Sequence, residues 1–183
     1  PVLFPERYQR LIAHLYESPE WKLLFTDGSE VLFGRRDLAG SVTEQPLART
    51  GETERLLSEL QARFSASPKV YAAARLSLAT LHGALGQWAQ AERALRDVNE
   101  PEAKALQARL RFAAGDLVAA ERLAQERLQT DRDDVGSLSL MAQVALRRGE
   151  NAEGLGHLRR ALRVRPFDQE ATRLLAKLEE NRR

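Results

Sequence analysis

Three glycines punctuate the second half of the sequence, and each follows a stretch of helical apolar spacing. Small residues recur seven positions before and five positions after each of them. The glycines are Gly86, Gly115 and Gly149, and the small residues are Ala79, Ala108 and Ala142 before them and Ala91, Ala120 and Gly154 after them. Antiparallel helices approach closely only where facing side chains are small, and the turn between them favours a residue that tolerates positive φ. The pattern predicts three antiparallel helix pairs.

Large apolar residues beside the small columns indicate that the pairs stack on one another. Leu78 and Met141 precede the first column, and Leu95 and Leu158 follow the second. Each pair would expose an apolar face until a neighbour covers it. Residues 168–183 predict a helix that caps the stack, since one face carries Ala171, Leu174, Leu175 and Leu178.

Over about residues 68–166 the sequence resembles the tetratricopeptide repeat (TPR) family. The interval from Gly115 to Gly149 matches the length of that repeat, and Pro166 stands where the unit-closing proline belongs. The interval from Gly86 to Gly115 is shorter by five positions, which we interpret as a shortened connection around residues 97–103. Arg127 stands where a small residue is usual, and the usually aromatic column holds His82, Arg111 and Ala145.

The resemblance implies a mainly α fold: a short α-solenoid of about three TPR-like helix pairs plus a capping helix. A helix at 5–17 and one β-hairpin at 21–36 precede it. We predict three parts, namely a helix plus β-hairpin element at 1–36, a linker at 37–51 that runs over the surface, and the TPR-like array at 52–183. The linker contains glycine and proline and few large apolar residues.

In the hairpin sequence WKLLFTDGSEVLFGRR, five of the apolar residues form two alternating sets, one in each strand. A two-residue turn at Asp27 and Gly28 would put the two sets on opposite faces. A three-residue loop, Thr26 to Gly28 with Gly28 left-handed, would put them on one face. We therefore predict the three-residue loop and a single face that packs on the neighbouring helices, formed by Trp21, Leu23, Phe25, Val31 and Phe33.

A short stretch of the N-terminal segment is also similar to the soluble tail of some bacterial multi-pass membrane glycosyltransferase-like proteins. The residues that carry the likeness are Pro19, Trp21, Phe25, Asp27, Val31, Phe33 and Arg35. The likeness implies an extracytoplasmic, for example periplasmic, location for the chain. Because the sequence begins at Pro1 without methionine, we expect it to be part of a longer protein.

Composition argues against several classes of function. The 28 basic and 26 acidic residues nearly balance, and the arginines are scattered, which disfavours nucleic acid as a partner. No apolar run approaches the roughly 18–20 residues of a membrane-spanning helix, so we expect no membrane insertion by this chain. The absence of cysteine excludes disulfides and thiol catalysis.

The polar residues likewise suggest no catalytic or metal site. The histidines, His14, His82 and His157, lie in unrelated segments, and His82 is expected to pack in or near the core. Asp133 and Asp134 stand at a turn, where an N-cap explains them. We therefore predict no enzyme, no metal and no cofactor, and any catalysis would lie in a missing upstream region.

The first helix of each pair in such arrays lines a concave face that commonly holds a peptide or partner helix. The register therefore predicts one row of partner-binding positions: Leu76, Thr80, Arg109, Phe112, Ser139 and Gln143. We expect a non-catalytic protein-protein interaction or scaffolding module with a protein or peptide partner. The alternatives are a spacer, a self-association surface, and the accessory tail of a membrane-bound glycosyltransferase-like protein.

Overall fold

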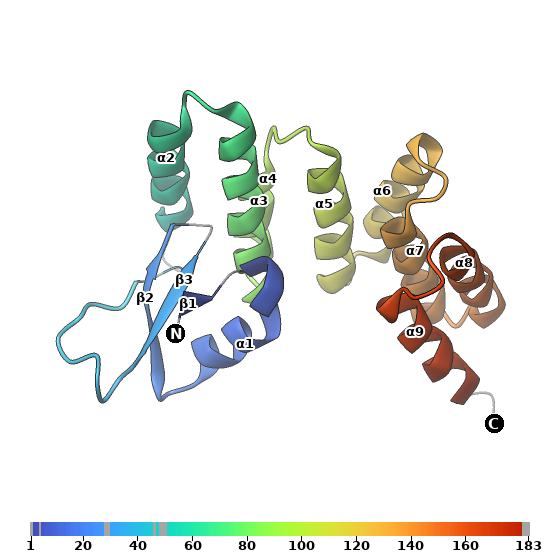
Figure 1. Ribbon diagram of the computed structural model, residues 1–183, viewed down its shortest axis with the longest axis horizontal. Coiled ribbons are helices and arrows are strands. Elements are labelled where there is room, and N and C mark those ends of the chain that lie inside the picture. Colours follow the sequence, from blue (N-terminus) through green and yellow to red (C-terminus); the bar gives the residue numbers. More distant parts are fainter. Residues whose placement is uncertain (1, 4, 28–29, 46, 48–50, 181–183) are drawn as a thin grey trace. The chain divides into compact units, whose positions relative to one another are not determined.

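The computed structural model describes residues 2–3, 5–27, 30–45, 47 and 51–180. The chain forms two compact units, Pro1–Glu100 (unit 1) and Pro101–Arg183 (unit 2). Unit 1 contains a small sheet and four helices, and unit 2 contains five helices among the described residues (Figure 1). The three-part division at 37–51 stays a prediction.

The sheet of unit 1 has three antiparallel strands in the order β1-β3-β2. They are β1 (Val2–Leu3), β2 (Trp21–Thr26) and β3 (Val31–Arg35). The predicted hairpin is therefore present, and β1 adds a third strand that the sequence did not indicate. Leu3 pairs with Val31, so the outer edge of β3 is covered by the start of the chain.

The predicted register of the hairpin is wrong. The predicted loop would pair Leu23 with Val31, whereas Leu23 pairs with Phe33 and Thr26 pairs with Val31, and a β-bulge lies between Leu23 and Phe25. The extra residue inverts the alternation of side chains along β2, so Thr26 is buried with Val31, and Phe25 is 50% exposed. Because Thr26 pairs with Val31, the strands are connected by residues 27–30 and not by the predicted three-residue loop. The left-handed conformation predicted for Gly28 lies outside the described residues.

The segment after β3 packs along the free edge of β2. The buried Lys22 ammonium donates to the carbonyl oxygens of Gly40 and Val42 at 3.1 and 2.7 Å. Gln45 donates its backbone N–H to the Leu23 carbonyl at 2.8 Å, and its side-chain oxygen accepts from the backbone of Thr26. Leu47 is fully buried. The segment predicted to be a surface linker therefore contributes a side chain to the core of unit 1.

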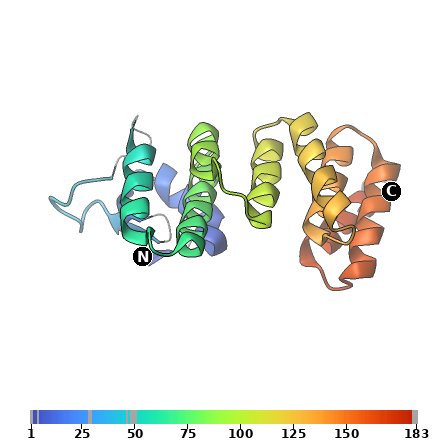
Figure 2. The ribbon, with the colours of Figure 1, turned by 90° about the horizontal axis from the view of Figure 1, so that it is seen from above.

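Four helices complete unit 1. They are α1 (Pro5–Glu17), α2 (Glu52–Phe64), α3 (Pro68–Ala84) and α4 (Trp88–Leu95). Helix α1 contacts the sheet and α3, and it buries Ile12 and Leu15, whereas Leu11 is exposed. Figure 2 shows α2 (blue-green) beside α3 (green). The hairpin therefore belongs to a unit in which α1 joins the sheet to the helices.

Helices α3 and α4 form the first predicted pair, and Ala79 and Ala91 are fully buried as the small-residue columns require. The short interval from Gly86 to Gly115 comes from the helix and not from a shortened connection. Helix α4 has 8 residues where α6 and α8 have 14. The Arg75 guanidinium donates to the carbonyl oxygens of Ala94 and Arg96 and so satisfies the end of α4.

Unit 2 contains the other two pairs and the predicted capping helix. The elements are α5 (Pro101–Ala113), α6 (Leu117–Thr130), α7 (Val135–Arg147), α8 (Asn151–Val164) and α9 (Gln169–Glu180). Leu138 and Leu158 are fully buried in the core between α7 and α8, and α9 adds Ala171 and Leu178 to the same core. The capping role predicted for residues 168–183 is confirmed over the described helix.

The three turn glycines adopt the left-handed conformation that the repeat pattern predicted, with φ of 69°, 88° and 81° at Gly86, Gly115 and Gly149. After each one, the next backbone N–H reaches back to a carbonyl five residues earlier. These carbonyl acceptors belong to His82, Arg111 and Ala145. The residue at the usually aromatic position of each repeat therefore supplies the carbonyl acceptor of the Schellman motif that ends the helix.

His82 is fully buried between α2, α3 and the turn before α4. Its Nδ1 lies 2.7 Å from the side-chain oxygen of Gln87, and its Nε2 lies 3.4 Å from the Thr53 hydroxyl. An amide oxygen can only accept, so Nδ1 carries the proton and Nε2 accepts from Thr53. Burial lowers the pKa of His82, and the Gln87 hydrogen bond and the charge of Glu54 oppose this only in part.

We expect unit 1 to lose stability as the pH falls below about 6.5, the ordinary pKa of histidine. Because folding lowers the pKa of His82, the unfolded chain takes up the proton first, and the free energy of unfolding falls until the pH passes the folded pKa. Urea unfolding followed by tryptophan fluorescence measures this in unit 1, which contains both tryptophans, Trp21 and Trp88.

Substitution of the histidines identifies the source of this pH dependence. The variant His82→Gln is expected to flatten the slope below about pH 6.5, whereas the exposed His14→Gln should retain it. An equal slope in His82→Gln and the unaltered chain would show that another group is responsible.

Candidate protein-binding groove

The first helices of the two pairs in unit 2, together with the capping helix, border two adjoining hollows. One has a volume of about 390 Å³ and is lined from α5, α7, α8 and α9. The second has a volume of about 320 Å³ and is lined from α5, α6, α7 and α9. Phe112 and Gln143 line both hollows. We call the continuous surface that they form the α5–α7–α9 groove.

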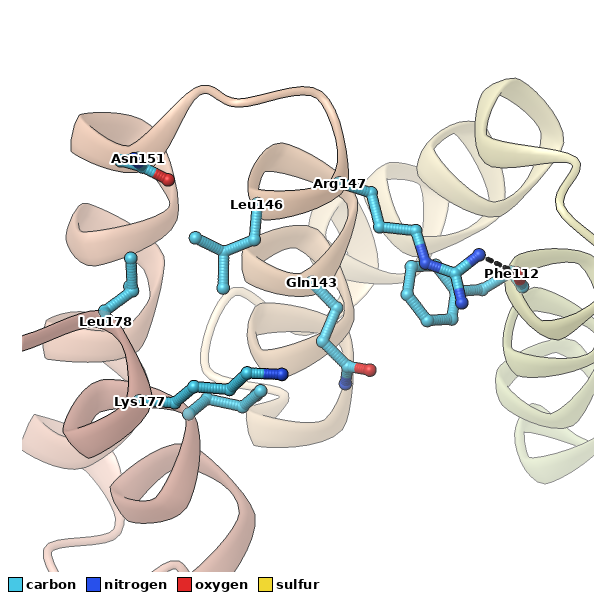
Figure 3. Close-up of a pocket in the computed structure, with 8 residues that line it drawn as sticks. Phe112, Gln143, Leu146, Arg147, Asn151, Lys177 and Leu178 are labelled. Atoms are coloured by element: carbon cyan, nitrogen blue, oxygen red, sulfur yellow. Dashed lines mark hydrogen bonds between the residues drawn. The ribbon is translucent and has the colours of Figure 1, made fainter. Parts of the chain in front are cut away.

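Phe112 and Arg147 form a fixed pair at the junction of the hollows (Figure 3). The Arg147 guanidinium carbon lies 4.2 Å from the centroid of the Phe112 ring, and one of its nitrogens donates to the Phe112 carbonyl at 3.3 Å. The ring and the carbonyl hold the guanidinium in one place. Its remaining N–H groups can donate to a ligand without a further loss of side-chain freedom.

The apolar part of the groove comes from side chains on both sides of that pair. Leu140 of α7 lines the smaller hollow with Phe112, and Leu146, Leu174 and Leu178 line the larger one. Leu146 and Leu178 point into the larger hollow in Figure 3. A side chain placed in either hollow would therefore contact carbon atoms, which is where apolar burial contributes to binding.

The charged side chains of the groove are mainly basic. Arg109, Arg147 and Lys177 line it, and Lys177 extends from α9 toward Gln143 of α7 (Figure 3). Neither Arg109 nor Lys177 forms an ion pair with any residue that the structure describes. The acidic Glu170 accepts a hydrogen bond from the Gln143 side chain at 3.0 Å. The lining of the groove therefore contains one exposed carboxylate and three cations.

Asp134 is a second acid in the lining, and local contacts balance its negative charge. Its carboxylate accepts from the Ser137 backbone N–H at 2.7 Å as the N-cap of α7, and it lies 3.5 Å from Arg127. Burial raises its pKa, but the hydrogen bond from Ser137 and the charge of Arg127 outweigh this and hold the pKa below its usual value. The predicted N-cap is confirmed. The contact with Asp134 also accounts for an arginine at position 127, where the repeat usually has a small residue.

The structure brings together three of the residues predicted to bind a partner. Arg109, Phe112 and Gln143 line the α5–α7–α9 groove. Ser139 is 1% exposed and does not line it. Thr80 is also buried, and its hydroxyl donates to the carbonyl of Leu76 at 2.9 Å, both within α3 of unit 1. For Leu76, a half-buried residue, partner binding stays a prediction.

Sequence reasoning missed Lys177, Arg147 and Glu170 as groove residues. The signal for Lys177 was present, because Arg109, Gln143 and Lys177 follow one another at the same interval that separates Gly115 from Gly149. The capping helix is α9, and the repeat spacing continues into it. Arg147 follows Gln143 by four residues and so lies on the same face of α7.

Within the described ranges, no three histidine, aspartate or glutamate side chains gather closely enough to hold a metal ion. None of the helices in the part of the chain that the structure describes is both long and apolar enough to cross a membrane.

Comparisons with known proteins support the fold. No family model matches the sequence, and no curated protein matches it. Among solved structures, the chain is similar to the crystal structure of MamA, a TPR-like protein. The two share 14% sequence identity with a TM-score of 0.55, over 72% of this chain and 80% of that chain. At that identity the likeness shows the fold alone, which is a mainly α solenoid of TPR-like helix pairs.

Proposed function

We propose that the chain is a non-catalytic protein-interaction module, and that unit 2 holds a segment of a partner polypeptide in the α5–α7–α9 groove. The observation that carries the proposal is the pair of hollows that share Phe112 and Gln143. Together they offer apolar contact and cations on the face formed by the first helices of the pairs. That combination suits a peptide, which presents both side chains and backbone acceptors.

The groove is also preorganised for binding. Arg147 is held by the Phe112 ring and carbonyl, and Gln143 is held by Glu170. Side chains that are already ordered lose little freedom when a ligand arrives, so more of the contact energy appears as affinity. Ordered polar side chains of this kind are not required in a helical array that acts only as a spacer.

Affinity capture from cells of the source organism tests the proposal. The double variant Arg109→Glu with Gln143→Ala places a negative charge in the groove and removes the amide that lines both hollows. We expect it to reduce recovery of at least one partner by about tenfold, or about 1.4 kcal/mol of binding free energy.

A matched variant controls for total charge. Arg163→Glu with Gln129→Ala makes the same chemical changes at exposed positions of α8 and α6 outside the groove. It should recover partners as the unaltered chain does. Equal recovery of every partner by all three proteins would contradict the proposal. Light scattering of the purified chain at two concentrations shows whether the captured partner is a second copy.

A further inference from the structure

We propose that the segment held in the α5–α7–α9 groove is acidic and extended, with two carboxylates six positions apart and two apolar side chains between them. The inference rests on the proposed function and specifies its partner. It follows from the spacing of the cations, the position of the hollows, and the dimensions of extended polypeptide.

The first step concerns charge. Arg109 and Lys177 lie at opposite ends of the groove, on α5 and α9, and form no ion pair within the described part of the chain. Arg147 lies between them with its guanidinium fixed over Phe112. With Glu170 as the one exposed acid that lines the groove, the surface is complementary to a segment that carries carboxylates.

The second step concerns length. Helix α7 contacts both α5 and α9, and packed helices lie 8–10 Å apart. Arg109, Gln143 and Lys177 occupy the same position of successive helices because one repeat length separates each from the next. The two terminal cations are therefore separated by roughly 16–20 Å. An extended chain rises about 3.3 Å per residue, so about six residues span that distance.

The third step concerns the side chains between the carboxylates. In an extended chain, every second side chain points to the same side. Carboxylates at the first and seventh positions would face Arg109 and Lys177, and the third and fifth side chains would face the hollows beside Phe112 and Leu146. The pattern is acid, any, apolar, any, apolar, any, acid. A helical segment rises only about 1.5 Å per residue and would need about twelve residues for the same span.

Synthetic peptides test this pattern directly. The probe is a labelled, N-acetylated and C-amidated nonapeptide, Gly-Glu-Ser-Leu-Ser-Leu-Ser-Glu-Gly, whose binding to the full chain is followed by fluorescence anisotropy. A second peptide replaces both glutamates with lysine. A third has the same composition with the glutamates adjacent. We expect the first peptide to bind at least about tenfold more tightly than either of the others.

Two double variants locate the binding. Arg109→Glu with Lys177→Glu should weaken the first peptide by at least about tenfold. Arg163→Glu with Lys69→Glu changes the charge equally at exposed positions of α8 and α3 and should leave its affinity within about twofold. Equal weakening by both variants would mean that total charge governs binding, and this would overturn the inference.

The peptides also separate this inference from the proposed function. If the lysine peptide binds as tightly as the glutamate peptide and Phe112→Ala weakens both, the groove holds peptides but the acidic specificity is wrong. If the adjacent-glutamate peptide binds as tightly as the first, the predicted spacing is wrong. If affinity capture detects no groove-dependent partner and no peptide binds, both the specificity and the proposed function fail.

Discussion

Leu47→Ala is expected to lower the free energy of unfolding of unit 1 by about 2–5 kcal/mol, the usual range for truncating a buried leucine. Leu47 lies in the segment between β3 and α2, yet it is fully buried. Truncation removes its apolar contacts and leaves a cavity that the surrounding side chains fill only in part. A residue in a plain surface connector would have almost no effect.

The same segment supplies the control. Leu38 is 77% exposed, so Leu38→Ala should change the free energy of unfolding by less than about 0.5 kcal/mol. Urea unfolding followed by the fluorescence of Trp21 and Trp88 reports on unit 1 for both variants. If the two variants were equally stable, the segment would not be part of the unit 1 core.

The second large effect is expected at Gly154, where α8 approaches α7. A Cβ atom at this position would lie 3.3 Å from the Ala142 carbonyl oxygen and 3.1–3.2 Å from the Leu146 side chain. The carbonyl belongs to the backbone of α7 and cannot move away without shifting that helix. Gly154→Leu should therefore lower the free energy of unfolding of unit 2 by about 1–3 kcal/mol through overpacking.

Gly156, in the same helix, is the matched control. A Cβ there meets no atom within 4 Å, so Gly156→Leu should stabilise unit 2 by about 0.5–1 kcal/mol through its higher helix propensity. Hydrogen exchange of the amides in α7 and α8 measures both changes in unit 2. Stabilisation by both substitutions would show that α7 and α8 do not need a small residue at Gly154.

The helix pairs could be predicted from the sequence because their determinants are local and repeated. A left-handed turn needs a residue such as Gly149, and a close helix contact needs a small residue such as Gly154, so each constraint appears at a fixed spacing. The cap at Asp134 followed in the same way from a turn beside a helix start.

The features that were predicted wrongly depend on distant contacts. The bulge at Leu24 shifts the register of β2, and it fits next to Gly34, where a Cβ would lie 2.6 Å from the Leu24 side chain. Alternating apolar residues alone cannot signal such an insertion. Leu47 likewise stands alone in a polar segment, so no periodicity marked it as core.

The candidate site was predictable in part for the same reason. The repeat register placed Arg109, Phe112 and Gln143 on one face, and all three line the α5–α7–α9 groove. Register could not show that Ser139 is covered, because burial depends on how closely neighbouring helices approach. The accessory-tail alternative rests on the resemblance of the N-terminal segment and stays a prediction.

The two units respond to acid through different groups. The first residues of α6, α7 and α9 are held by the carboxylates of Asp116, Asp134 and Asp168. Contacts hold the pKa of Asp134 below its usual value, so the cap of α7 stays charged in mild acid. Helices α2, α3 and α4 have no side-chain cap hydrogen bond, and unit 1 instead buries His82. Mild acid therefore weakens unit 1 through His82 and leaves the Asp134 cap of unit 2 charged.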